Sequence, residues 1–139
     1  MILLDTNVLS ELLRPAPEPR VVAWVGQQAD DLALTAITAA ELLAGVAALP
    51  EGRRRTLLGH QVVTVLEDYD SRGSIVPFDL DAATHYADVL SRRRRAGRPI
   101  STPDAQIAAI CRAHDASLET RNVRDVEGTG IPAIINPWD

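Results

Sequence analysis

The sequence has 139 residues, of which 46% are hydrophobic and 24% are charged, and its formal net charge is −5. This composition and length predict one globular domain spanning residues 1–139 and exclude a disordered chain or a fibrous repeat. The longest apolar runs fall far short of the roughly 20 residues that cross a bilayer, and Asp5 comes too early for a secretory signal, so we expect a cytoplasmic protein without membrane contact.

In the first half of the chain, short apolar runs alternate with helical patterns, in which hydrophobic residues recur every three or four positions. Pro15, Pro17 and Pro19 separate two of these patterns, and Pro50 closes a third. The predicted elements are a strand at 1–4, a helix at 8–13, a helix at 21–26, a strand at 32–35 and a helix at 38–49.

The second half continues the alternation. Gly73 ends a long amphipathic helix, and Thr102 and Pro103 open a later one, because threonine caps helices and proline is tolerated in their first turn. The predicted elements are a helix at 51–70, a strand at 74–78, a helix at 79–97, a helix at 105–113 and strands at 116–120 and 131–135.

Strands and helices that alternate in this order predict a layered α/β domain, in which helices flank a central, mainly parallel five-stranded sheet. Such sheets bind their ligands at the carboxyl ends of the strands. The informative polar residues of this sequence fall at those ends.

Five acidic or amide residues occupy predicted junctions between a strand and a helix: Asp5, Glu41, Asp104, Asn122 and Asp125. Each also has a purely structural interpretation, because all of these residue types stabilise helix starts. The spacing of Thr38 and Glu41, for example, is that of a capping box.

Taken together, these residues indicate chemistry. Junctions on one edge of a small sheet crowd together, and crowded carboxylates either take up a proton or bind a cation. Oxygen ligands without histidine or thiolate favour a hard ion such as Mg²⁺ or Mn²⁺, which binds readily where it can share its ligands with a phosphate. The pattern therefore suggests a nuclease.

All 14 basic residues are arginines, and eight of them gather at 53–55, 92–95 and 98. Guanidinium groups suit phosphate oxygens, so these clusters are candidates for contacts with a nucleic-acid backbone. The alternative is that they are solvated helix faces.

Four segments resemble PIN domains of the VapC toxin type: MILLDTNVLSELLRP, AITAAELLAGVA, TPDAQIAAI and TRNVRDVEGTGI. The pieces VVAW and NPWD make the chain especially similar to the FitB branch. The resemblance covers essentially the whole chain and implies a PIN-like three-layer fold.

The resemblance also implies a Mg²⁺- or Mn²⁺-dependent ribonuclease. Its metal-binding and catalytic carboxylates fall on Asp5, Glu41 and Asp104. Some relatives have a fourth aspartate where this chain has Asn122, with Asp125 three residues later, so either residue is a candidate for completing the site. The residues expected to bind the substrate are Thr6, Asn7, Thr120 and Arg121.

The expected mechanism is hydrolysis of RNA by an activated water, with Asp5 and Asp104 holding an ion and Glu41 holding it too or accepting a proton. This would leave a 5′-phosphate and a 3′-hydroxyl. The resemblance further implies a homodimer and a VapB- or FitA-like antitoxin that carries the contact with DNA. Both partners are expected on the apolar helices at 8–13 and 39–49.

Two alternatives remain. Because the fourth carboxylate is missing, the chain could be a catalytically weak or inactive PIN module that serves a DNA-binding antitoxin. An aspartyl phosphatase or a phospho-acceptor receiver fits less well. The phosphatase needs an aspartate where the chain has Asn7, and the receiver needs a lysine, which this sequence lacks.

Overall fold

A parallel five-stranded sheet lies at the centre of the computed structural model, which describes all residues from Met1 to Asp139. The strands are β1 (Ile2–Leu4), β2 (Leu32–Thr35), β3 (Ile75–Val76), β4 (Ser117–Glu119) and β5 (Ile134–Ile135). Their order is β3-β2-β1-β4-β5, and every neighbouring pair is parallel. This confirms the predicted sheet.

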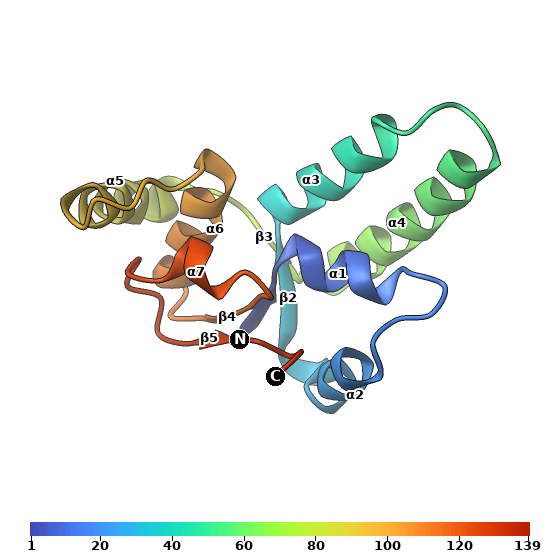
Figure 1. Ribbon diagram of the computed structural model, residues 1–139, viewed down its shortest axis with the longest axis horizontal. Coiled ribbons are helices and arrows are strands. Elements are labelled where there is room, and N and C mark those ends of the chain that lie inside the picture. Colours follow the sequence, from blue (N-terminus) through green and yellow to red (C-terminus); the bar gives the residue numbers. More distant parts are fainter.

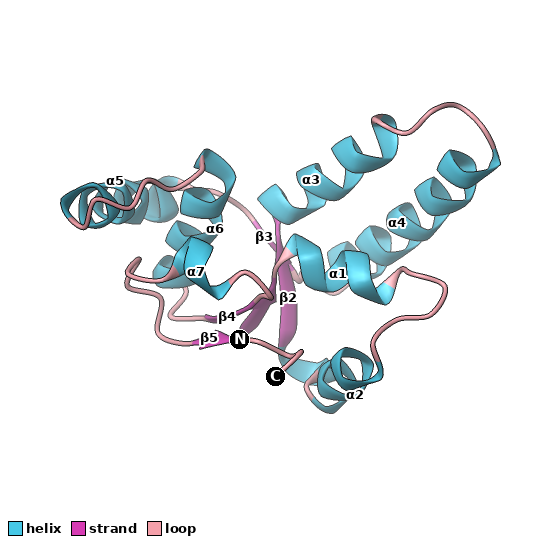
Figure 2. Ribbon diagram, viewed as in Figure 1, coloured by secondary structure: helices cyan, strands magenta, loops and turns pink.

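Helices cover both faces of the sheet, which gives three layers (Figures 1 and 2). One face is covered by α1 (Thr6–Leu12), α2 (Pro19–Gln27), α3 (Ala36–Ala47) and α4 (Arg53–Ser71). The other is covered by α5 (Leu80–Arg95), α6 (Thr102–Ala113) and α7 (Val123–Val126). None of the helices combines the length and the apolar composition that a membrane crossing requires.

Successive side chains along each strand point to opposite faces of the sheet, so each face has its own hydrophobic core. Leu3 of β1 joins the core beneath α6, whereas its neighbour Leu4 joins the core beneath α1 and α4. Ala33 and Leu34 of β2 divide in the same way. The central strands read as continuous apolar runs in the sequence because both of their faces are buried.

Several predicted element boundaries are wrong. The helix predicted from residue 38 begins at Ala36, because Thr35 is its N-cap. The helix predicted from 105 begins at Thr102, and Ser101 rather than Thr102 caps it. The third and fifth strands keep only two residues each in the ladder, and a short 3₁₀ turn, Ala29–Asp31, precedes β2.

One arginine of the 92–95 cluster is part of the protein interior. Arg93 is 5% exposed, and its guanidinium donates to the carbonyl oxygens of Arg98, Pro99, Asp125 and Glu127. It is therefore neither a solvated surface residue nor free for a phosphate. Arg92, Arg94 and Arg95 are exposed.

Glu119 of β4 is fully buried, and neither of its carboxylate oxygens has a hydrogen-bond partner. It lies in register between Leu4 of β1 and Ile135 of β5, so its side chain shares a face with the apolar Leu4. Burial raises the pKa of Glu119 from its ordinary 4.5 to about 8. Nothing in the sequence pattern distinguishes this unpaired buried acid from an ordinary strand residue.

This burial predicts a stability that declines with pH. Between about pH 4.5 and pH 8 the folded protein keeps a proton on Glu119 that the unfolded chain releases. The free energy of unfolding should therefore fall across that window by up to about 1.4 kcal/mol per pH unit. In urea titrations, Glu119→Gln should match the unaltered protein at pH 5 and exceed it at pH 8, and the exposed Glu67→Gln should show no such difference. Parallel pH profiles for Glu119→Gln and the unaltered protein would contradict this account.

Candidate active site

Three parallel strands deliver polar residues to one edge of the sheet. Asp5 follows β1, Thr35 ends β2 and Thr120 follows β4. A polar pocket of about 510 Å³ lies at this edge. Its lining residues are Asp5, Thr6, Asn7, Ser10, Glu11, Arg14, Glu41, Asp104, Arg121, Asn122 and Trp138.

Asp5 is the most deeply placed of the three predicted metal-binding carboxylates, at 7% exposure. Its Oδ1 accepts from the Thr6 backbone N–H at 2.8 Å, so it also caps α1. Its Oδ2 accepts from Thr120 Oγ1 at 2.8 Å and from Asn7 Nδ2 at 3.1 Å. Burial raises the pKa of Asp5 and the charge of Glu41 adds to this, while these hydrogen bonds oppose the shift.

A hydrogen-bond network joins the segment after β4 to the first turn of α1. Thr120 Oγ1, which donates to Asp5, accepts from Asn7 Nδ2 and from the Asn122 backbone N–H, each at 3.1 Å. Asn7 Oδ1 accepts from the Arg121 backbone N–H at 3.0 Å. Thr120 is fully buried, so it supports Asp5 from below rather than lining the pocket.

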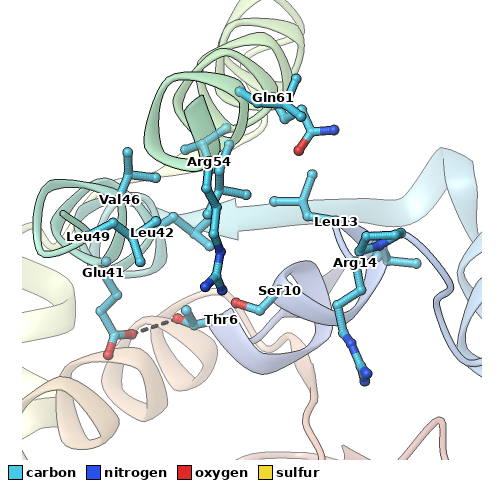
Figure 3. Close-up of a pocket in the computed structure, with 16 residues that line it drawn as sticks. Thr6, Ser10, Leu13, Arg14, Glu41, Leu42, Val46, Leu49, Arg54 and Gln61 are labelled. Atoms are coloured by element: carbon cyan, nitrogen blue, oxygen red, sulfur yellow. Dashed lines mark hydrogen bonds between the residues drawn. The ribbon is translucent and has the colours of Figure 1, made fainter. Parts of the chain in front are cut away.

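Glu41 reaches the pocket from the second turn of α3. Thr6 Oγ1 donates to Glu41 Oε1 at 2.7 Å (Figure 3). The alternative interpretation of Thr38 and Glu41 as a capping box is wrong, because the helix begins earlier and Thr35 Oγ1 accepts from the Thr38 backbone N–H. Glu41 is therefore not needed as a cap and faces the site.

Asp104 lies in the first turn of α6, as the sequence predicted, and its backbone N–H donates to the Ser101 hydroxyl at 3.3 Å. Burial raises the pKa of Asp104, and the negative charges of Asp5 and Asp125 contribute to the shift. The Ser101 hydrogen bond and the charge of Arg93 act in the opposite direction. The charge of Asp5 therefore acts on Asp104, and both carboxylates line the same pocket.

Most of the residues singled out in the sequence meet in this pocket. Those that line it are Asp5, Glu41, Asp104, Asn122, Thr6, Asn7 and Arg121. Asp125 is exposed and lies outside the lining, although its charge reaches Asp104.

The sequence interpretation missed four lining residues: Ser10, Glu11, Arg14 and Trp138. Two of them carried a usable signal, because Ser10 and Glu11 follow Thr6 and Asn7 by four positions and therefore share their face of α1. No sequence signal pointed to Trp138, since it lies far along the chain from the other lining residues and only the folded structure brings it to the pocket.

The donors of the pocket fit a hard divalent ion. The carboxylates of Asp5, Glu41 and Asp104 offer only oxygen atoms as ligands, and Mg²⁺ and Mn²⁺ prefer oxygen. No group of three or more His, Cys, Asp or Glu side chains lies close enough to form a complete metal site. Mg²⁺ commonly uses one or two protein carboxylates and fills its remaining positions with water or phosphate, so an open pocket of this kind is compatible with it.

An apolar groove of about 780 Å³ adjoins the polar pocket and shares Thr6, Ser10, Arg14 and Glu41 with it. The groove runs between α1, α3 and α4, and Arg54 extends from α4 across it (Figure 3). Its apolar lining residues are Leu12, Leu13, Pro15, Leu42, Val46, Leu49, Leu57, Leu58 and Val62.

Comparisons with known proteins support the resemblance noted in the sequence. The VapC ribonuclease Y4jK of Sinorhizobium fredii is 42% identical over 144 aligned residues, covering 100% of this chain and 99% of that protein. Toxin FitB of Neisseria gonorrhoeae is 40% identical over 139 residues, covering 99% of each.

A solved structure of FitAB bound to an IR36 DNA fragment matches this fold with a TM-score of 0.91. The match has 39% identity and covers 100% of this chain and 96% of that one. The PIN domain family itself matches residues 2–124. By sequence and by fold, this chain belongs to the PIN domain family.

Proposed function

We propose that this chain is the toxin of a toxin–antitoxin pair and acts as a Mg²⁺- or Mn²⁺-dependent endoribonuclease. The observation that carries the proposal is the convergence of Asp5, Glu41 and Asp104 on one polar pocket at the carboxyl edge of the sheet. The names of the relatives, a VapC ribonuclease and a FitB toxin, support it.

Asp5 and Asp104 would hold the ion, and Glu41 would assist them. A bound divalent ion would offset the repulsion between these carboxylates and polarise a phosphodiester. Asp5 is held in place by three hydrogen bonds, so it reaches the pocket already oriented. Asn122 lines the same pocket and would supply a neutral oxygen, while Asp125 would act only through its charge.

Glu41 is also our candidate for accepting the proton of the attacking water. Thr6 donates to Glu41 Oε1, and no protein group donates to Oε2. One oxygen is thus fixed while the other remains available, which is the arrangement a general base needs. Thr6, Asn7 and Arg121 would contact the RNA at the same rim, with Thr120 holding Asp5 below them.

The apolar groove between α1, α3 and α4 would bind the antitoxin. It is continuous with the pocket through Thr6 and Glu41, so a segment lying in it could also block the carboxylates. The FitAB relative was solved with DNA, and we assign any DNA contact of the present system to the antitoxin. We further propose that residues 1–139 act as one domain in a cytoplasmic homodimer.

Metal removal tests the nuclease proposal. Antitoxin-free protein, incubated with RNAs of varied sequence, should cleave in Mn²⁺ or Mg²⁺ and lose all cleavage in EDTA. Asp104→Asn should be inactive in either ion, and the exposed Asp70→Asn should cleave like the unaltered protein. Cleavage that persists in EDTA would contradict the assignment.

The same assay separates the proposal from an inactive PIN module. Asn122 stands where some relatives have a carboxylate, and one fewer negative charge weakens the hold on a cation. If the protein binds Mn²⁺ but cleaves no RNA at any ion concentration, the chain serves its antitoxin without catalysis. Cleavage that requires unusually high Mn²⁺ would instead support a weakened but working site.

A further inference from the structure

Arg121 extends from the segment after β4 to the rim of the polar pocket, where it lies over an aromatic ring. Its guanidinium carbon is 5.0 Å from the centroid of the Trp138 ring. The Arg121 side chain makes no hydrogen bond and no ion pair, although four carboxylates line the same pocket. Its charge is therefore held in place without being neutralised.

The other arginine of the pocket behaves differently. Arg14 Nη1 lies 3.2 Å from one oxygen and 3.3 Å from the other oxygen of the buried Glu11, so its charge is paired. Arg72, which also lies over an aromatic ring at 4.6 Å, pairs in addition with Asp68 at 2.8 Å. Arg121 alone combines an aromatic support with an unpaired guanidinium.

Both ends of this contact are anchored. The Arg121 backbone N–H donates to Asn7 Oδ1, which ties its main chain to α1. Trp138 packs against the core beneath α1 and α4, and its backbone N–H donates to Asn136 Oδ1 at 3.0 Å. The ring can therefore act as a fixed support for the longer and more mobile arginine side chain.

An aromatic face attracts a guanidinium without using its N–H donors. Those donors lie in a planar fork that matches two phosphate oxygens. A pocket of carboxylates repels a phosphodiester, and an unpaired positive charge at its rim offsets that repulsion. The arrangement thus suits the capture of an RNA phosphate beside the acids.

We propose that Trp138 is a positioning residue that holds Arg121 ready to bind a backbone phosphate of single-stranded RNA. This inference rests on the proposed function for its ligand, and it adds a residue to which the sequence analysis gave no role. Trp138 acts here through Arg121 and not by stacking on a base.

Two measurements test the inference. The first is the Kd of a fluorescein-labelled single-stranded RNA in EDTA, measured by anisotropy, which requires no cleavage. The second is the separation of KM from kcat for cleavage in Mn²⁺. Trp138→Leu keeps apolar packing but removes the aromatic face, and it should raise Kd and KM about tenfold with kcat nearly unchanged. Trp138→Phe should fall between Leu and the unaltered protein.

Trp24→Leu is the matched control, because Trp24 packs against the same core but carries no arginine on its ring. It should leave Kd and KM unchanged. Thermal melting of each variant checks that the fold persists. A rise in Kd for Trp24→Leu equal to that for Trp138→Leu would assign the effect to general loosening of the core and overturn the inference.

A double-mutant cycle separates positioning from direct stacking. If Trp138 acts through Arg121, then Arg121→Ala with Trp138→Leu should bind RNA no more weakly than Arg121→Ala alone. Additive losses would overturn the inference. Cleavage with a KM insensitive to Trp138→Leu would refute it and leave the nuclease proposal standing. RNA binding that depends on Trp138, in a protein that never cleaves, would support the inference and refute the nuclease proposal. Absence of both RNA binding and cleavage would refute both.

Discussion

Asp5→Asn is expected to lower metal-dependent RNA cleavage by about a thousandfold or more while the protein stays folded. Asparagine has nearly the same shape as aspartate but lacks the negative charge that would hold the ion. Asp5 is the most buried of the three carboxylates, so little water is available to take over its role. The measurement is the single-turnover rate at saturating Mn²⁺, and isothermal titration should show weaker Mn²⁺ binding.

The effect on stability should be small because two changes oppose each other. The substitution removes a buried charge whose burial already raises the pKa of Asp5. It also places an amide or a weaker acceptor opposite the donors Thr120 and Asn7, which costs about 1–2 kcal/mol. Asp70→Asn, on the exposed surface of α4, provides the control. A variant that cleaves normally would remove Asp5 from the proposed site.

Much of this site could be predicted because its residues follow strands. Asp5 and Thr120 come directly after short buried runs, and parallel strands bring such residues to one edge however far apart they lie in sequence. The helix start near Asp104 could also be predicted from the sequence, because a proline and an acidic residue are typical of the first turn of a helix. The prediction of the fold and of the candidate carboxylates thus relied on local sequence patterns.

What the sequence could not supply depends on contacts between distant segments. Thr35 rather than Thr38 caps α3, because β2 ends at Thr35, so Glu41 lies in the second turn and lines the pocket. Arg121 and Trp138 meet because β4 and β5 pair in parallel, so that the segments following the two strands leave the sheet at the same edge. No periodicity in the chain encodes either arrangement.

The burial of Arg93 also depends on contacts between distant segments. In the sequence it is one of four consecutive arginines, yet α5 turns it inward while its neighbours remain exposed. Its guanidinium connects the turn after α5 to α7 through four backbone carbonyls. Arg93 thereby fixes the positions of the segments that carry Asp104 and Asn122.

Arg93→Met should destabilise the protein by about 3–5 kcal/mol, because it leaves these carbonyls without their charged donor. Arg93→Lys should lose less, since an ammonium keeps the charge but cannot span all four oxygens. Arg94→Met, one position along on the exposed face, should stay within about 0.5 kcal/mol of the unaltered protein. Urea unfolding midpoints measure all three changes.

Hydrogen exchange then locates the damage. In Arg93→Met, the amides of α7 should lose protection before those of the central strands, because α7 would be released from α5 while the sheet retains its own hydrogen bonds. Cleavage should also weaken as Asn122 loses its fixed position beside the pocket. Equal midpoints for Arg93→Met and Arg94→Met would show that the buried guanidinium contributes nothing to stability. Uniform loss of protection would place its effect on the whole fold rather than on the attachment of α7.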